Sequence, residues 1–182
     1  MRVSRVLPHA ILALGGLALV LALRRGDPEA GRRRGGTIVF ACEPELLGSI
    51  TWRGEAETVR IEPADAETGA RWIRVTPRGS EDGGERFRGG AAVARWTEGL
   101  APLRARRVLG DLDARTRAAL DLEPPRARLT LRCGARETSF DVGGRAFGRG
   151  DRYLRRAEGG PVFLVARERL APLERAPRAL AE

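Results

Sequence analysis

Short segments in which apolar and polar residues alternate dominate the chain from Thr37 onward, and they constrain the fold more than any other feature. In "SITWRG", "ETVRIEP" and "RWIRVTP", apolar side chains occupy every second position, and Gly, Pro and acidic residues separate the segments. A period of two is typical of half-buried antiparallel strands. The pattern returns in "RARLTLRC", "ETSFDVG", "DRYLRRA" and "PVFLVA". The sequence therefore predicts two groups of hairpin-sized strands.

Three other segments predict helices. In "AAVARWTEGLAPLRARRV", apolar residues from Val93 to Leu103 recur with a helical period, and Pro102 predicts a helix end or kink beside it. "DLDARTRAALDL" predicts a short helix capped by Asp111 or Asp113. "ERLAPLERAPRAL" predicts a helix that closes the chain.

These elements together predict an α+β fold. We expect one or more antiparallel sheets of short meander strands with helices packed on one face. The pairs "ITWRGEAETVRIE" and "LTLRCGARETSFDV", and "LAPLRAR" and "LAPLERA", are similar, so two related β-meander/helix halves are an option within this fold. One N-terminal transmembrane helix is expected to precede the domain.

The expected membrane helix is the uncharged segment Val6–Leu23, which has arginines on both flanks. About 18 helical residues span roughly 27 Å, which is enough for the hydrocarbon core of a bilayer. A cleaved signal peptide is the alternative, but no clear small-x-small cleavage site follows the segment. We therefore divide the chain into a tail at 1–5, an anchor at 6–23, an Arg/Gly-rich linker at 24–36 and a single domain at 37–182.

The net charge of +9 comes from 33 basic and 24 acidic residues, and the basic residues are all arginine. Arginine excess without lysine is typical of a GC-rich genome and is weak evidence for a nucleic-acid partner. The first 36 residues hold more than half of the net charge, which leaves a modest excess for the domain. We therefore argue against nucleic acid and expect the linker arginines to contact the membrane surface. They are Arg24, Arg25, Arg32, Arg33 and Arg34.

Arg126, Arg128 and Arg132 share one parity of the strand predicted in "RARLTLRC". They are either a face for an anionic ligand or partner, or the solvated side of a strand in an arginine-rich protein. We favour the solvated side and keep the ligand face as the alternative.

The residues offer no catalytic, cofactor or metal site. The only histidine, His9, lies inside the apolar segment, so a Ser or Cys nucleophile in the domain would lack a histidine base. A phosphate-binding loop of the Walker type needs the lysine that this chain lacks. Cys42 and Cys133 stand too far apart in sequence to predict a zinc site. We therefore predict no enzymatic activity and no cofactor.

The two cysteines leave two interpretations open. Cys42 and Cys133 could form a disulfide in an oxidising compartment. Alternatively, Cys133 is a small inward-facing apolar residue and Cys42 is a free thiol, and we favour this second interpretation.

The order of these signals resembles the bacterial family named domain of unknown function 4340. The similarity covers residues 45–175 and is sharpest in "LDLEPP", residues 120–125, which is followed by an alternating strand. The resemblance implies a protein of the bacterial envelope, anchored once in the inner membrane, with its domain on the extracytoplasmic side. The arginines after the apolar segment favour the opposite orientation by the positive-inside rule.

By this resemblance, we expect a membrane-anchored accessory or interaction protein of an envelope assembly, such as an ABC-type transport or gliding-type system. The alternative is a module that binds an anionic envelope ligand, either a lipid headgroup or an acidic glycan, through its arginine-bearing strand faces.

Overall fold

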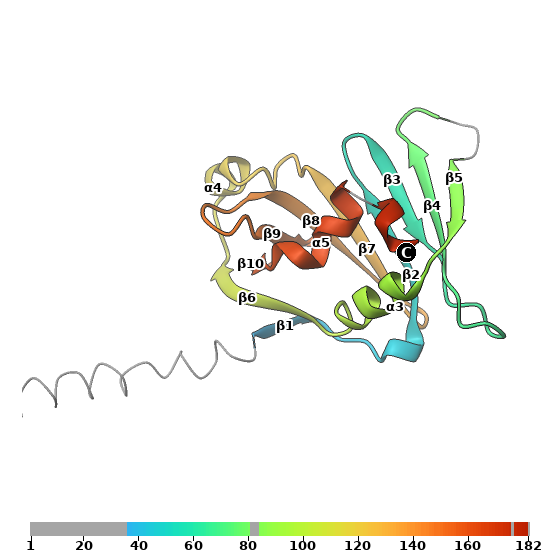
Figure 1. Ribbon diagram of the computed structural model, residues 1–182. Helices are drawn as coiled ribbons and strands as arrows, with labels where there is room; N and C mark the ends of the chain where they lie inside the picture. The colour runs from blue at the N-terminus through green and yellow to red at the C-terminus, as the bar shows by residue number, and fades with distance from the viewer. Residues whose placement is uncertain (1–35, 81–83, 176, 182) are drawn as a thin grey trace, which may run out of the picture. The chain divides into compact units, whose positions relative to one another are not determined.

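Ten strands join edge to edge into one antiparallel sheet in this computed structural model, which describes residues 36–80, 84–175 and 177–181 (Figure 1). Their order across the sheet is β1-β6-β10-β9-β8-β7-β2-β3-β4-β5. The strands are β1 (Thr37–Phe40), β2 (Leu47–Arg53), β3 (Glu57–Ile61), β4 (Trp72–Pro77), β5 (Glu85–Arg88), β6 (Leu103–Gly110), β7 (Ala127–Cys133), β8 (Arg136–Arg145), β9 (Arg152–Arg156) and β10 (Val162–Val165).

Helices are a minor part of the described chain, so the predicted α+β class is wrong. The described residues hold only three short α-helices and two 3-10 turns, and the fold is mostly β. The helical elements are α3 (Ala91–Glu98), α4 (Ala114–Ala119), α5 (Arg167–Arg175), η1 (Pro44–Leu46) and η2 (Pro177–Leu180). Of the two expected caps, Asp111 and Asp113, Asp113 caps α4, because its carboxylate accepts a hydrogen bond from the Thr116 amide at 2.7 Å.

The main difference lies within residues 91–108, where a helical period extends to Leu103 and Pro102 predicted a helix end or kink beside it. The helix α3 stops at Glu98, Gly99 follows it, and Leu103 begins strand β6. Leu103 and Ala105 point inward with the period of a strand, and β6 pairs with both β1 and β10. Strand β5 also forms where the sequence pattern predicted no strand. These added strands extend the sheet at its two ends.

Two four-stranded meanders meet at the centre of the sheet. Strands β2 to β5 run to one edge and are followed by α3, whereas β7 to β10 run the other way and are followed by α5. The pairing of β2 with β7 joins them, and it places Trp52 opposite Leu129 and Ile50 opposite Leu131.

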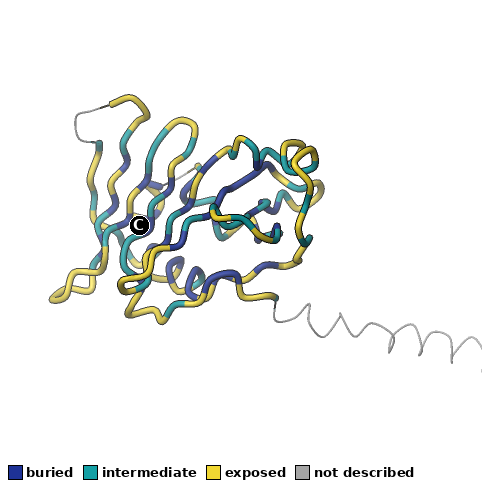
Figure 2. The backbone as a smooth tube through the Cα atoms, turned by 180° about the vertical axis from the view of Figure 1, so that it is seen from behind, coloured by how far each residue is buried: buried dark blue, intermediate teal, exposed yellow. Residues whose placement is uncertain are grey.

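The hydrophobic core lies on the inner face of this sheet, which curls around α3, α5 and η2 (Figure 1). Alternate strand residues such as Val59, Leu129 and Phe140 are fully buried there, and Leu170 and Leu173 of α5 pack against them. Figure 2 shows buried and exposed positions alternating along the strands. The opposite, outer face of β2 to β5 and β7 therefore carries the polar residues.

The buried guanidinium of Arg71 bridges a register shift in β2. It donates hydrogen bonds to the carbonyl oxygens of Leu47 at 2.7 Å, Gly48 at 2.8 Å and Glu62 at 3.2 Å. Burial lowers the pKa of Arg71 below its ordinary value. These bonds satisfy backbone acceptors that the shifted ladder leaves open.

Cys42 and Cys133 are joined by a disulfide, and the interpretation that we favoured from the sequence, with Cys42 as a free thiol, is wrong. The bridge links the segment after β1 to the end of β7, and Cys133 is the cross-strand neighbour of Leu47. Because the two cysteines are 91 positions apart in the sequence, no local pattern predicts that they lie close together.

None of the helices in the described residues has both the length and the apolar character that crossing a bilayer requires. The predicted anchor at 6–23 and the linker at 24–36 lie outside the described residues, apart from Gly36.

Candidate anion-binding face of the sheet

Arginines line the outer face of five neighbouring strands. Each of them alternates with inward-pointing core residues, so a strand that buries one parity presents arginine on the other. We call this set the arginine face. Its members, all exposed, are Arg53, Arg60, Arg74, Arg86, Arg128 and Arg132.

The strand register places arginines of the arginine face directly opposite one another on neighbouring strands. Arg53 of β2 lies opposite Arg128 of β7. Arg60, Arg74 and Arg86 are successive neighbours across β3, β4 and β5. Like charges placed directly opposite each other destabilise a sheet. An anion bound between these side chains would relieve that repulsion.

Acidic partners neutralise only part of the arginine face. Glu62 accepts a hydrogen bond from Arg86 at 2.9 Å and lies 3.8 Å from Arg74. The guanidinium of Arg86 also stacks over the Trp72 ring, 4.2 Å from its centroid. Within the described part of the chain, Arg53 and Arg60 make no ion pair.

A partly buried charge network supports one side of the arginine face. Asp141 of β8, 4% exposed, accepts from Arg128 at 2.9 Å and from Arg155 of β9 at 3.4 Å. Arg155 also donates to Glu123 at 3.3 Å, and Arg117 of α4 donates to the same carboxylate at 2.8 Å. Three guanidinium groups thus share two carboxylates.

The network favours the charged form of Glu123 and leaves a donor of Arg155 unused. The hydrogen bond from Arg117, assisted by the charge of Arg155, lowers the pKa of Glu123 below its ordinary value. The Nε–H of Arg155 is buried and has no hydrogen-bond partner in the described part of the chain. The network therefore has an excess of positive charge and of donors.

Replacing Asp141 by Asn should lower the free energy of unfolding by about 2 kcal/mol, because it removes the charge that two guanidinium groups share at a buried position. Urea unfolding measures the change. Glu137→Gln on the same strand is the matched control: Glu137 is exposed and opposite Arg132, and its replacement should cost less than about 0.5 kcal/mol. Equal effects of the two substitutions would contradict a structural role for the network.

The three arginines singled out from the sequence separate in the structure. Arg128 and Arg132 lie on the arginine face, where Arg132 donates to the carbonyl of Gly134 at 3.2 Å. Arg126 precedes β7, pairs with Asp121 at 2.8 Å and lines a pocket on the inner side of the sheet.

Sequence reasoning missed the arginines of β2 to β5. The signal was present, because Arg53, Arg60 and Arg74 each stand next to the buried residues of their strands. The sequence pattern does not reveal the order of the strands, and this order is what brings the arginines of β2 to β5 beside Arg128. The predicted membrane-surface arginines, 24, 25 and 32–34, lie outside the described residues.

Comparison with known proteins places no constraint on the function of this chain. No family model matches this chain, and neither a curated protein nor a solved structure shows significant similarity to it. Among the described residues, no group of three or more His, Cys, Asp or Glu side chains is placed to hold a metal ion.

Proposed function

We propose that this domain is a non-catalytic binding module of the bacterial envelope whose arginine face recognises an acidic glycan chain. The observation that carries the proposal is the direct cross-strand pairing of arginines, Arg53 with Arg128 and Arg60 with Arg74 and Arg86. A linear polyanion laid across the strands would meet cations at the strand spacing of about 4.8 Å. Guanidinium groups suit carboxylates because they bind them with two parallel hydrogen bonds.

The shape of the sheet favours a flexible chain over a flat bilayer as the ligand. Because the sheet curls around its helices, the outer face is convex (Figure 1). A planar array of lipid headgroups would meet only its crest, whereas a polymer can follow the curve. The hydroxyl groups of Thr51 and Thr130, neighbours in the same rows, supply further hydrogen-bonding groups.

One observation and one expectation support an extracytoplasmic location. The disulfide between Cys42 and Cys133 is typical of proteins in oxidising compartments. The resemblance of residues 45–175 to the domain of unknown function 4340 family implies the same side of the envelope.

Binding of the full chain to alginate, a polyuronate, tests the proposal, with neutral dextran as the comparison. We expect alginate binding that weakens steeply as salt rises, because exposed charge pairs are screened. The triple variant Arg53→Gln, Arg60→Gln and Arg74→Gln should lose affinity by about tenfold or more, which corresponds to roughly 1.4 kcal/mol.

The matched control carries the same charge change away from the arginine face, as Arg95→Gln, Arg115→Gln and Arg149→Gln, and should bind like the parent. An equal loss of alginate affinity in both triple variants would show that binding depends only on net charge, and it would overturn the proposal. Preferential, salt-sensitive binding to phosphatidylglycerol vesicles would instead assign the face to lipid headgroups.

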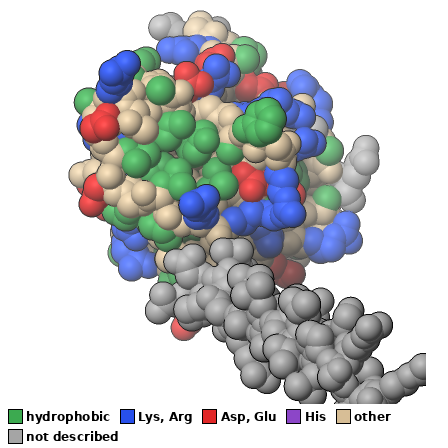
Figure 3. Space-filling view, turned by 90° about the vertical axis from the view of Figure 1, so that its left-hand side faces the viewer, with side chains coloured by type: hydrophobic (Ala, Val, Ile, Leu, Met, Phe, Trp, Pro, Cys, Tyr) green, Lys and Arg blue, Asp and Glu red, His purple; other side chains and the backbone are tan. Residues whose placement is uncertain are grey.

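A protein partner in an envelope or transport assembly is a second candidate, favoured by a different surface. On the side of the molecule seen in Figure 3, hydrophobic side chains gather in a patch with arginines around it. Among the described residues, the large hydrophobic side chains with high exposure are Ile38, Leu46, Val108 and Phe147. Exposed apolar patches mark protein contacts. Salt-tolerant capture of one partner by cross-linking at this patch would favour it.

A further inference from the structure

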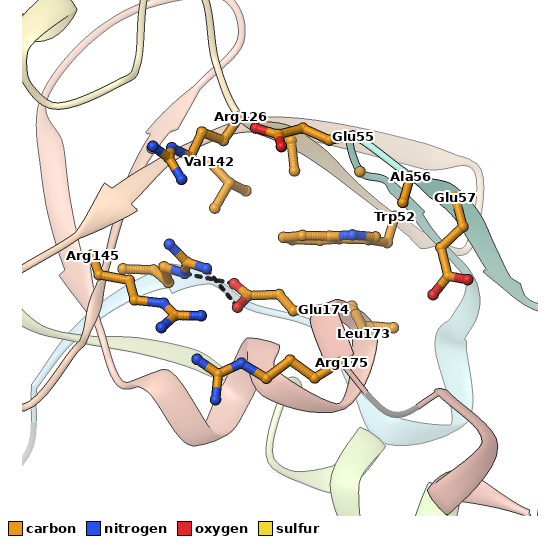
Figure 4. A pocket seen from close by; sticks show the side chains of 14 residues that line it. Trp52, Glu55, Ala56, Glu57, Arg126, Val142, Arg145, Leu173, Glu174 and Arg175 are labelled. Atoms are coloured by element: carbon orange, nitrogen blue, oxygen red, sulfur yellow. Dashed lines mark hydrogen bonds and ion pairs between the residues drawn. The ribbon is translucent and has the colours of Figure 1, made fainter. Parts of the chain in front are cut away.

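A small pocket opens on the inner side of the sheet, where the end of α5 approaches the turn between β2 and β3 (Figure 4). Its volume is about 250 Å³. At about 30 Å³ per water molecule, this is room for roughly eight waters, so its ligand would be small. Trp52 and the arginine face belong to opposite faces of the sheet, because Trp52 and Arg53 are consecutive on β2.

One end of the pocket carries uncompensated positive charge. Arg145 of β8 and Arg175 of α5 extend toward each other from opposite sides, as Figure 4 shows. Neither side chain has an ion pair or hydrogen bond among the described residues. Arg152, beside them, is neutralised by two 2.6 Å hydrogen bonds to Glu174. The charge of Arg175 is the largest cause that lowers the pKa of Arg145 below its ordinary value, which reflects their mutual repulsion.

The middle of the pocket offers an apolar surface with one free donor. Trp52 is 5% exposed, and Val142 and Leu173 lie beside it in the lining. Its indole N–H has no hydrogen-bond partner in the described chain, whereas the indole of Trp96 donates to the carbonyl of Arg169 at 3.0 Å. An indole N–H usually donates to an acceptor, which can be solvent. A ligand atom in the pocket can supply the one that the protein lacks.

Two carboxylates line the opposite end of the pocket, and the nearby Arg126 is paired with Asp121 at 2.8 Å. Glu55 and Glu57 line the side formed by the β2–β3 turn, away from Arg145 and Arg175 (Figure 4). This separation of charge would orient a ligand and would repel a second anionic group at its far end. The pocket therefore suits a molecule with one acidic group and a neutral or cationic remainder.

We propose that this pocket binds a small molecule through a single carboxylate or phosphate group, held between the guanidinium groups of Arg145 and Arg175, with its apolar part against Trp52. The two arginines supply bidentate hydrogen bonds to the oxyanion, and the bound anion removes the repulsion between them. The proposal is independent of glycan binding, because the two sites share no residue.

Indole N–H signals in ¹⁵N-labelled full-length protein give a direct test, because the chain has three tryptophans and Trp52 alone lines this pocket. The probes are benzoate, phenyl phosphate and the neutral benzyl alcohol, and Trp52→Phe assigns the signal. We expect benzoate or phenyl phosphate to shift the Trp52 signal in a saturable manner while the Trp72 and Trp96 signals stay in place.

Arg145→Gln and Arg175→Gln should each weaken binding of the anionic probe about tenfold. Arg95→Gln, an equal charge change on α3, should leave the affinity unchanged. Preference for phenyl phosphate over benzoate would identify the group as phosphate, and the reverse preference as carboxylate. The proposal fails if neither anion moves the Trp52 signal, if benzyl alcohol binds as tightly as they do, or if Arg145→Gln has no effect.

Discussion

Reduction of the Cys42–Cys133 disulfide should lower the free energy of unfolding by about 4 kcal/mol, the largest effect that we expect from a single bond in this protein. The bridge closes a loop of 91 residues, and a cross-link of that length removes much of the conformational freedom of the unfolded chain. For a chain of this size, the loss corresponds to a fall in the melting temperature of roughly 10 °C.

Thermal unfolding with and without a thiol reductant measures this change on an unaltered sequence. The double variant Cys42→Ala and Cys133→Ala should reproduce the result in the absence of reductant, and reductant should then have no further effect. Both cysteines pack against the core, so any extra loss in the double variant reports on packing rather than on the cross-link. An unchanged melting temperature on reduction would show that the bridge does not stabilise the fold.

Replacing Glu174 by Leu should cost about 3 kcal/mol or more, because it leaves the charge of Arg152 buried without a partner. The side chains of Arg152 and Glu174 are 11% and 8% exposed, and two hydrogen bonds of 2.6 Å join them. The unpaired guanidinium would also face Arg145 and Arg175. Urea unfolding gives the free energy.

The double variant Arg152→Met and Glu174→Leu should recover much of the lost stability, since a well-packed apolar pair often replaces a buried ion pair at little cost. Glu158→Leu is the control for loss of an ion pair at the surface, where Glu158 lies 3.4 Å from Arg156 and is 67% exposed. It should change stability by less than about 1 kcal/mol. A cost for Glu174→Leu no greater than that of Glu158→Leu would contradict the argument.

The repeated motif "LAPL" shows how far local sequence can determine structure here. Leu100, Leu103, Leu170 and Leu173 are all fully buried, as their apolar character predicts. Yet the second copy lies inside α5, whereas the first connects α3 to strand β6. Gly99, a poor helix former, ends α3 just before the first copy, and the pairing of β6 with β1 and β10 extends the chain after it.

The arginine face shows the same difference between what local sequence predicts and what the pairing of distant strands decides. The alternation around Arg128 was sufficient to predict that it points away from the core, and the same rule places Arg53 and Arg60 on the outer side of their own strands. Their contact across β2 and β7 depends on a pairing between segments about 75 residues apart, which no local pattern encodes. The pocket at Trp52 likewise combines residues from β2, β8 and α5 that no motif relates.

The sequence by itself determined which apolar side chains of the alternating segments are buried and where seven of the strands lie, because alternation and hydrophobicity act over a few residues. It also narrowed the cap of α4 to Asp111 or Asp113, because a cap depends on a contact three residues away, and Asp113 is the one that forms it. Only the tertiary structure decided that the strands form one sheet, that Cys42 meets Cys133, and that the arginines share a face. Those outcomes depend on which distant segments pair, and pairing is set by the packing of the whole core rather than by the preferences of any one segment.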